Sequence, residues 1–220
     1  MSKQSSTRLL FVRHGESEVT VRQVIGGDKA CTGLSYLGRQ QAAALGQRWA
    51  QGHEPKVDAL WSSTLPRAFE TAELLAEPLG GLDVQTHLDL VERRPGMADG
   101  VAFRDFSDQF EWERDHHPHI PLAPGAESQS DFFHRTGKAI YELVEANPGT
   151  TMMLVCHGGV IDVAFRVLLG LAPSAPFVLW TLNTSITEFS TTDRPGLWRL
   201  VRYNDFSHLH GLPTRTEPAV

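Results

Sequence analysis

The sequence predicts an α/β fold: a doubly wound, mostly parallel sheet with helices on both faces, an antiparallel edge and one inserted lid region. Short apolar runs at residues 9–12, 59–61 and 152–156 carry this prediction. Continuous apolar runs of this length are typical of strands buried on both faces. Each run is followed by a segment whose apolar residues recur at helical spacing. Strands that alternate with helices in this way indicate a sheet covered on both sides.

Four helices are expected around these strands. Ser35 can cap the first, and Ser63 or Thr64 the second, because a side-chain hydroxyl can accept from a free backbone N–H of the first turn. The other two are expected at residues 131–146 and 159–169 from the spacing of their apolar side chains. These helices supply the apolar surfaces that a sheet buried on both faces requires.

The last part of the chain has a different pattern. Residues 185–190 and 197–203 both read as strands, and they flank a short segment that contains Asp193, Pro195 and Gly196. Two strands joined by so short a turn form a β-hairpin. We therefore expect the sheet to end in an antiparallel edge.

Residues 95–126 are irregular. A long insertion without a regular pattern of its own is often a lid or a binding loop. Phe103, Phe106, Phe110 and Trp112 show partial helical spacing, which favours packing within a small lid helix over recognition of a ligand. We expect this insertion to set the specificity of the molecule.

Composition bounds the domain organisation and the kind of partner. A chain of 220 residues suits a single domain over residues 1–220, with 95–126 as its lid and specificity insertion. The 20 Lys and Arg against 26 Asp and Glu give a formal charge of −6, which argues against nucleic-acid binding through a broad basic surface. Cys156 lies inside an apolar run and is expected to be a small core residue rather than a reactive thiol.

The apolar runs are all short. None approaches the ~20 residues of a membrane span, and the run at 9–12 is too short for the core of a signal peptide. We therefore expect a cytoplasmic protein with no membrane partner. The sequence leaves the oligomeric state open, with a homodimer as one option.

Chemically suggestive side chains follow three of the predicted strands. Arg13 and His14 end the first strand, Arg67 lies one turn into the helix after the second, and His157 and Gly158 follow the third. Ligands of open α/β sheets bind beyond the carboxyl ends of the strands, so we expect these residues to converge. No acidic pair stands there to hold a divalent metal, and we expect neither a metal nor another cofactor.

These residue types suit a phosphate group. Guanidinium groups offer planar forks of N–H donors to phosphate oxygens, and the backbone N–H groups at Gly158 can face an anion at the start of a helix. A neutral imidazole can attack phosphorus, and on this chemistry either His14 or His157 can be the nucleophile. The sequence thus indicates phosphoryl transfer without a metal, from a small phosphorylated molecule.

Seven blocks of sequence follow one another in the order known from a single family. They are residues 13–17 (Arg-His-Gly-Glu-Ser), 34–42, 62–72, 90–92 with Gly96 and Gly100, 124–128, 155–159 and 183–186. In content and order they resemble the motifs of the histidine phosphatase superfamily, in the branch that includes cofactor-dependent phosphoglycerate mutases. The resemblance covers about residues 8–210 and implies the phosphoglycerate mutase-like fold.

The resemblance also implies a role for each site residue. His14 would be the nucleophile that becomes phosphohistidine. Arg13, Arg67 and His157 would hold the phosphoryl oxygens and stabilise the transition state. Glu92 would be the general acid for the leaving oxygen and then the base for water.

Some residues depart from the family pattern or leave two interpretations open. Thr20 stands where the family usually has Asn, and its hydroxyl can still donate one hydrogen bond to a substrate. Residues 26–33 either close over a phosphate or form a plain surface loop. Residues 116–119 (His-His-Pro-His) indicate a solvated loop, more consistent with substrate contact than with a metal. Arg93 and Arg94 either reach a second acidic group of the substrate or are exposed.

Three functions compete on these observations. We favour a phosphatase that hydrolyses small-molecule phosphomonoesters. A phosphoglycerate mutase would use the same residues, but Arg94 and Pro95 depart from the mutase pattern, and residues 95–126 contain no counterpart of the insertion that builds the mutase carboxylate site. A catalytically dead module that binds phospho-ligands would need a lost catalytic residue, and all five implied ones are present.

Overall fold

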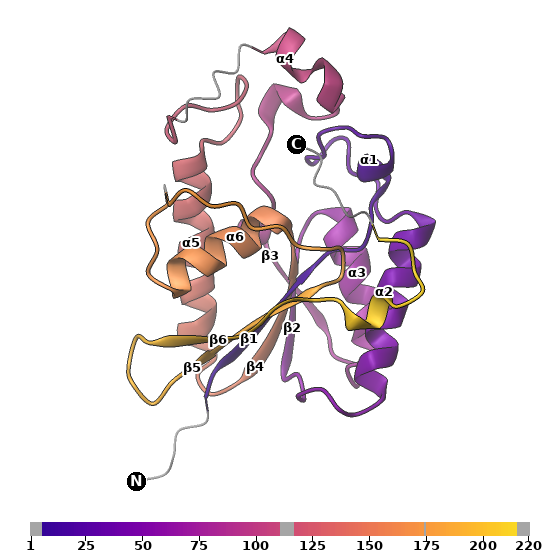
Figure 1. Ribbon diagram of the computed structural model, residues 1–220, viewed down its shortest axis with the longest axis vertical. Helices are drawn as coiled ribbons and strands as arrows, with labels where there is room; N and C mark the ends of the chain where they lie inside the picture. The colour runs from indigo at the N-terminus through magenta and orange to yellow at the C-terminus, as the bar shows by residue number, and fades with distance from the viewer. Residues whose placement is uncertain (1–5, 111–116, 174, 215–220) are drawn as a thin grey trace.

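The computed structural model describes residues 6–110, 117–173 and 175–214, and its centre is one mixed sheet (Figure 1). The strands are ordered β3-β2-β4-β1-β5-β6. The first four in sequence are parallel, β5 runs antiparallel to β1, and β6 runs antiparallel to β5. The strands are β1 (Arg8–Arg13), β2 (Ala59–Ser63), β3 (Val84–His87), β4 (Thr151–Cys156), β5 (Ile186–Thr191) and β6 (Trp198–Asp205).

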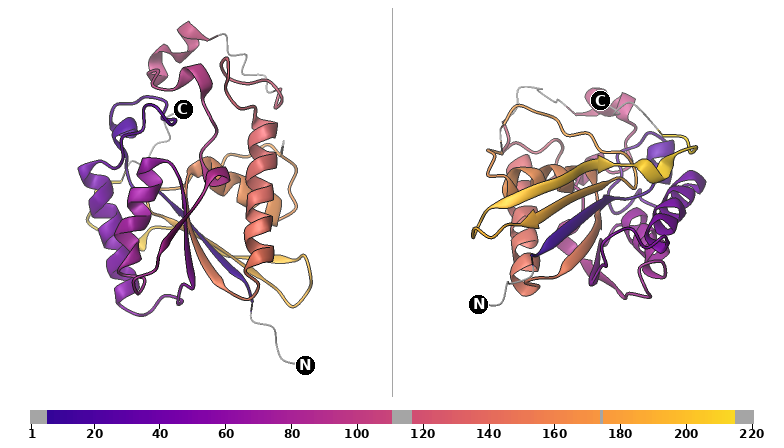
Figure 2. Two further views of the ribbon diagram at one scale, coloured as in Figure 1. Left: turned by 180° about the vertical axis from the view of Figure 1, so that it is seen from behind. Right: turned by 60° about the horizontal axis from the view of Figure 1, so that its bottom comes forward.

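Helices cover both faces of this sheet, as the sequence predicts (Figures 1 and 2). One side carries α2 (Tyr36–Ala50) and α3 (Pro66–Ala76), and the other carries α5 (Gln129–Ala146) and α6 (Gly158–Leu168). The described chain also has two short helices, α1 (Glu18–Val21) and α4 (Phe106–Gln109), and 3-10 turns at Leu88–Leu90, Gly96–Ala98, Phe103–Asp105 and Ser207–Leu209.

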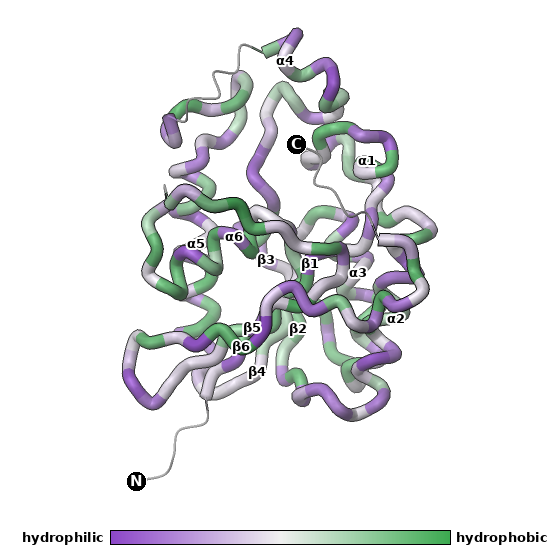
Figure 3. Tube along the Cα trace, viewed as in Figure 1, coloured by the Kyte–Doolittle hydropathy of each residue, from purple (hydrophilic) through white to green (hydrophobic). Residues whose placement is uncertain are grey.

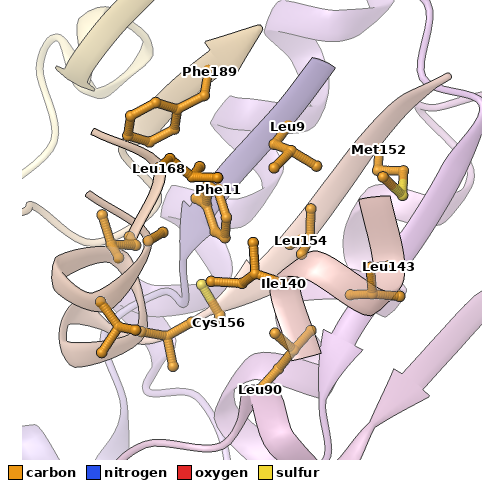
Figure 4. Packing of buried hydrophobic residues seen from close by; sticks show 14 of the residues in the cluster. Leu9, Phe11, Leu90, Ile140, Leu143, Met152, Leu154, Cys156, Leu168 and Phe189 are labelled. Carbon is orange, nitrogen blue, oxygen red and sulfur yellow. The ribbon is translucent and has the colours of Figure 1, made fainter. Parts of the chain in front are cut away.

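Alternate residues of β1 and β4 enter two separate cores. Leu9 and Phe11 pack with Leu154 against α5 and α6 (Figure 4), whereas Leu10 and Val12 face α2 and α3. The four apolar residues of β1 are fully buried because each face of the strand meets a helical layer. This explains why the strand is a continuous apolar run rather than an alternating one.

Of the two helix caps predicted from the sequence, the structure confirms the one before α2 and corrects the one before α3. The hydroxyl of Ser35 accepts from the backbone N–H of Gly38 at 3.0 Å, which confirms the predicted cap. The predicted cap at Ser63 or Thr64 is wrong, because α3 begins at Pro66 and its cap position is Leu65, without a side-chain hydrogen bond. Pro66 presets the helical backbone at this position, so no capping hydroxyl is needed.

The hairpin of β5 and β6 confirms the expected antiparallel edge. The strand β3, at the opposite edge, was not predicted. Its segment Val84–His87 has a single apolar residue, Val84, and its middle residues are exposed. An edge strand with one partner can form without the apolar pattern that a central strand needs.

The inserted region lies beyond the carboxyl ends of the parallel strands (Figure 1), and hydrophilic and hydrophobic residues mix along it (Figure 3). The rings of Phe106 and Phe110 contact each other with centroids 5.2 Å apart, which confirms packing within a small helical segment. Phe103 is exposed, and Trp112 lies outside the described residues.

Candidate active site

His14 follows directly after β1 and is almost fully buried. Its Nδ1 lies 2.7 Å from the carbonyl oxygen of Gly15. A carbonyl oxygen only accepts, so Nδ1 carries the proton of the neutral ring and Nε2 keeps its lone pair. Nε2 accepts a hydrogen bond from Nε of Arg67 at 3.1 Å. The nitrogen that can act as a nucleophile is therefore the one that faces the arginine.

The electrostatic surroundings keep this ring neutral. Burial lowers the pKa of His14 well below its ordinary value, and the charges of Arg67 and Arg13 lower it further. The hydrogen bond to the carbonyl of Gly15 acts in the opposite direction but is weaker. A neutral ring at neutral pH is what attack by its lone pair requires.

The backbone around His14 is held from three directions. The carbonyl oxygen of His14 accepts from the amide of Asn183 at 2.8 Å, and the backbone N–H of Gly15 donates to Thr71 on α3 at 3.1 Å. A Cβ atom at Gly15 would lie 2.5 Å from the carbonyl oxygen of Gly38 on α2, so a side chain does not fit there. Asn183 and Thr71 were not singled out in the sequence, because their hydrogen bonds go to backbone atoms.

Two buried guanidinium groups act on His14, Arg67 through a hydrogen bond and Arg13 through its charge. Arg67 comes from the first turn of α3, is 4% exposed and also donates to the carbonyl oxygen of Gly26 at 3.0 Å. Arg13 donates to the carbonyl oxygen of Thr181, and its Nε is buried without a hydrogen-bond partner among the described residues. Burial lowers the pKa of Arg13, although the charge of Glu92 raises it.

Neither of these arginines forms an ion pair with a carboxylate in the part of the chain that the structure describes. Charges taken out of water are normally paired, because the loss of solvation is large. Arg13 and Arg67 thus form a site to which an anion would bring the missing negative charge.

His157 approaches His14 from the next parallel strand. It follows β4 and stands at the start of α6, and the two rings have centroids 5.1 Å apart. Its Nε2 lies 2.8 Å from the hydroxyl of Ser63, and its Nδ1 is buried without a partner among the described residues. Burial lowers its pKa well below the ordinary value, followed by the charges of Arg67, His14, Arg13 and Arg135. When Ser63 donates to Nε2, Nδ1 carries a proton that is free for a ligand.

Glu92 lies on the irregular segment after β3, close to the start of α6. One carboxylate oxygen accepts from the backbone N–H of Arg93 and the other from that of Gly159, each at 2.9 Å. A Cβ atom at Gly159 would lie 2.2 Å from Oε1 of Glu92. The carboxylate therefore needs glycine at position 159, which the sequence indicated only as part of a helix start.

The structure brings Arg13, His14, Arg67 and His157 together at the carboxyl ends of β1, β2 and β4, with Glu92 close by. The N–H of Gly158 has no hydrogen bond in the described chain, and its contact with a substrate stays a prediction. Thr20 lies on α1, where its hydroxyl is 2.9 Å from that of Ser17, and its contact with substrate stays a prediction too.

The loop at 26–33 is fastened to the inserted region. The carboxylate of Asp99 accepts from the backbone N–H groups of Gly27, Lys29 and Ala30 at 2.9, 2.8 and 3.2 Å. Together with the bond from Arg67 to Gly26, this fixes the loop beside the arginines. The loop therefore lies against Arg67, and its closure over a phosphate stays a prediction.

Arg93 and Arg94 have different surroundings. The side chain of Arg94 is 46% exposed and lies 3.6 Å from Glu127 and 3.8 Å from Asp89. The Arg93 guanidinium has no hydrogen bond or close ion pair in the described chain; burial lowers its pKa, and the charges of Glu92 and Glu127 raise it less. It lines a cavity of about 220 Å³ that also touches Glu92 and Phe132. Arg93 is thus the one that can meet a bound molecule.

Of the other residues considered from the sequence, Cys156 has a role in the core, and the described histidines of residues 116–119 have no contact that indicates a function. Cys156 is fully buried in the core, as predicted, and burial raises the pKa of its thiol. His117 and His119 are exposed, and His116 lies outside the described residues. Over residues 6–110, 117–173 and 175–214, no group of three or more His, Cys, Asp or Glu could hold a metal ion. In the same ranges, no helix is both long and apolar enough to cross a bilayer.

Comparison with known proteins places these residues in context. Residues 9–206 match the family described as histidine phosphatase superfamily (branch 1). The chain is 31% identical over 205 residues to phosphoglycerate mutase-like protein 4 of Arabidopsis thaliana, covering 91% of this chain and 86% of that one. It is 28% identical over 211 residues to a metal-independent phosphoserine phosphatase of the same plant, covering 92% and 83%.

A solved structure agrees with these relatives. The chain superposes on a mycobacterial glucosyl-3-phosphoglycerate phosphatase with a TM-score of 0.75, at 26% identity, covering 91% of this chain and 99% of the other. The likeness spans nearly the whole of both chains, so it includes the sheet and the strand ends that carry the site.

Proposed function

The chain belongs to the histidine phosphatase superfamily (branch 1) and is a phosphoric monoester hydrolase, and we propose that it hydrolyses small-molecule phosphomonoesters through a phosphohistidine on His14. One observation carries the proposal. The unprotonated Nε2 of His14 lies among arginines that have no carboxylate partner in the described chain. Nucleophile and anion site therefore coincide.

Binding comes first. The dianionic phosphoryl group sits among the donors of Arg13, Arg67 and His157, which supply the charge stabilisation that a metal gives in other enzymes. Arg67 has to release Nε2 of His14 and turn its Nε–H towards a phosphoryl oxygen. The same Nε–H thus orients the imidazole before the substrate binds and holds a phosphoryl oxygen afterwards.

In the first chemical step Nε2 attacks phosphorus, and the bond from phosphorus to the leaving oxygen breaks. The leaving oxygen takes the proton of the protonated Glu92 carboxyl. The ring keeps its proton on Nδ1. The carbonyl oxygen of Gly15 accepts a hydrogen bond from this N–H and so stabilises the positive charge of the phosphohistidine. This carbonyl is what the geometry adds to the roles implied by the sequence.

In the second step water attacks the phosphohistidine. The carboxylate of Glu92 takes a proton from the water, the phosphorus–nitrogen bond breaks, and Nε2 regains its lone pair. Inorganic phosphate leaves, and Glu92 is protonated again for the next substrate. Each group returns to its starting state, so the cycle needs no metal and no cofactor.

The alcohol part of the substrate fits the cavity beside Glu92. This cavity of about 220 Å³ is smaller than the ~300–1,000 Å³ of drug-sized sites, which favours a small leaving group. Its lining combines the aromatic rings of Phe132 and Phe133 with the free guanidinium of Arg93. We also propose a cytoplasmic location, which the unpaired Cys31 and Cys156 support.

The test uses the purified protein with EDTA present. It is mixed with 3-phosphoglycerate and catalytic 2,3-bisphosphoglycerate, and the release of phosphate and the formation of 2-phosphoglycerate are followed together, with p-nitrophenyl phosphate alongside. Phosphate release without isomer formation is the expected result. Rapid isomer formation with little phosphate release would instead make the protein a mutase. His14→Ala should abolish both turnover and the trapped phosphoenzyme, and full turnover of this variant would overturn the site.

A further inference from the structure

Arg135, on α5, contacts the backbone of the segment that carries Glu92. Its Nη1 donates to the carbonyl oxygens of Asp89 at 2.9 Å and Val91 at 3.1 Å. Its Nη2 donates to the carbonyl oxygen of Glu92 itself at 3.2 Å. One side chain thus holds three carbonyl groups within four consecutive residues.

The guanidinium is held in turn by Glu127. Nε and Nη2 of Arg135 each lie 2.7 Å from one oxygen of the Glu127 carboxylate, in a two-pronged ion pair. The two side chains are only 12% and 8% exposed. A planar bidentate pair of this kind fixes direction as well as distance. Phe132 adds a ring that lies 5.0 Å from the guanidinium carbon of Arg135.

Glu127 also holds the far side of the same segment. Its backbone N–H donates to the carbonyl oxygen of Arg94 at 2.8 Å, and its carboxylate accepts from the backbone N–H of Arg94 at 3.2 Å. Residues 89–94 are therefore fastened to the start of α5 before and after Glu92. After the 3-10 turn that ends at Leu90, residues 91–94 belong to no strand or helix and have no sheet ladder to hold them.

The aim of the Glu92 carboxylate depends on this backbone. Its two hydrogen bonds come from main-chain N–H groups, that of Arg93 in the same segment and that of Gly159 on α6. No hydrogen bond joins Arg135 to His14, Arg13 or Arg67 in the described chain. A change at Arg135 would thus reach the chemistry through Glu92, or through its charge, which lowers the pKa of His157.

We propose that Arg135, locked by Glu127, is a positioning residue that keeps Glu92 in place to protonate the leaving oxygen. This inference rests on the proposed function, because it needs Glu92 to be the general acid. This role explains why Arg135 is buried in an ion pair with Glu127. It also explains why most of the other hydrogen bonds of Arg135 go to carbonyl groups of one short segment.

The dependence on the leaving group tests this role. A nitrophenolate leaves without a proton, whereas an alkoxide needs one, so loss of the general acid slows alkyl phosphates more. For Arg135→Met we expect kcat/KM to fall about 10-fold to 100-fold with 2-glycerol phosphate and less than about threefold with p-nitrophenyl phosphate, since general acids contribute about 10²–10⁴. Arg135→Lys keeps the charge on His157 but cannot make the same set of bonds, and it should show a smaller shift of the same kind.

Glu92→Gln gives the reference pattern. It should show the same selective loss with the alkyl phosphate, and Arg135→Met added to it should change the ratio of the two substrates no further. An equal loss with both substrates, or a further change of the ratio in the Glu92→Gln protein, would overturn the positioning role. If Glu92→Gln itself showed no selective loss, the general acid of the proposed function would be wrong, and with it this inference.

Arg48 supplies the control. It is also largely buried on a helix, α2 on the opposite face of the sheet (Figure 1), and forms ion pairs with Glu54 and Asp205, but it does not line the cavity beside Glu92. Arg48→Met should lower the melting temperature as Arg135→Met does and leave the substrate ratio as in the wild type. Circular dichroism identifies any variant that fails to fold. If Arg135→Met fails to fold, Glu127→Gln takes its place, because it breaks the ion pair that locks Arg135 and also weakens the contacts of Glu127 with Arg94 in the same segment.

Discussion

Arg67 donates from Nε to Nε2 of His14 across 3.1 Å, so the arginine engages the lone pair with which the histidine attacks in the proposed mechanism. The charge of the same arginine lowers the pKa of His14, which keeps the ring neutral. In that mechanism an incoming phosphoryl group accepts from the guanidinium in place of Nε2 and so frees the nitrogen to attack.

Replacing Arg67 should change both the rate and its pH dependence. Arg67→Met removes a donor to the transition state and should lower kcat about 10²–10³-fold. It also removes a charge that lowers the pKa of His14, so this pKa rises and the acidic limb of kcat/KM moves to higher pH. Arg67→Lys, which keeps the charge, should lower the rate without moving that limb. An acidic limb that stays in place in Arg67→Met would contradict the electrostatic account.

Gly159→Ala should disable Glu92 without disturbing the helix. The new Cβ would lie 2.2 Å from Oε1 of Glu92, so the carboxylate has to move. We expect kcat/KM for an alkyl phosphate to fall up to about 10²-fold, the lower end of what a general acid contributes. At Gly158 the nearest atom to a Cβ is 3.6 Å away, and Gly158→Ala should lose far less. Steady-state kinetics of the two variants, side by side, settle the comparison.

Asp99→Asn should loosen the loop at 26–33. The carboxylate accepts from three backbone N–H groups, and an amide cannot satisfy all three because its nitrogen is a donor. We expect a loss of stability of about 1–3 kcal/mol, as for unsatisfied polar groups, together with a higher KM for any phosphomonoester. Urea unfolding and initial rates measure the two effects. An unchanged KM would mean that this loop does not border the bound substrate.

The stability of the fold should fall as the pH is lowered from 7 to 5. Burial, with the charge of Arg48 next, lowers the pKa of His208 to about 4, and His14 and His157 are lowered too. In the unfolded chain these groups take up protons below pH 6.5, which the folded chain does not, so acid favours unfolding. The contribution is complete above 6.5 and is lost towards the folded pKa. His208→Gln should reduce the drop in melting temperature between pH 7 and 5, and an identical drop would exclude His208 as a cause.

The sequence foretold the central part of the fold for a simple physical reason. A strand covered by helices on both faces needs apolar residues at successive positions. The central strands β1, β2 and β4 could therefore be recognised in the sequence as continuous apolar runs. The edge strand β3 gave no such signal, because one partner and a solvated side place few demands on its residues. The wrong cap at Ser63 has a cause in the site, since that hydroxyl lies against His157.

The candidate site was foreseeable in outline and not in detail. The strand-end rule brought His14, Arg67 and His157 together, but residue chemistry alone left both histidines open, and only the family resemblance implied His14. The carbonyl of Gly15 and the direction of the Arg67 guanidinium, which support the proposed role of His14, could not be read from the sequence. No pattern in the sequence marks Arg135, for a related reason. Its partners are main-chain carbonyl groups, and every residue type carries one.

Arg13 and Arg67, which form no ion pair with a carboxylate among the described residues, have a consequence for regulation by the product. In the proposed mechanism these arginines contact only the phosphoryl oxygens and not the alcohol part of the substrate. They should therefore hold inorganic phosphate by the same contacts. The product should therefore compete with the substrate and, by binding only the folded chain, raise its melting temperature as well. A rise in cellular phosphate would then slow turnover while it lengthens the life of the protein.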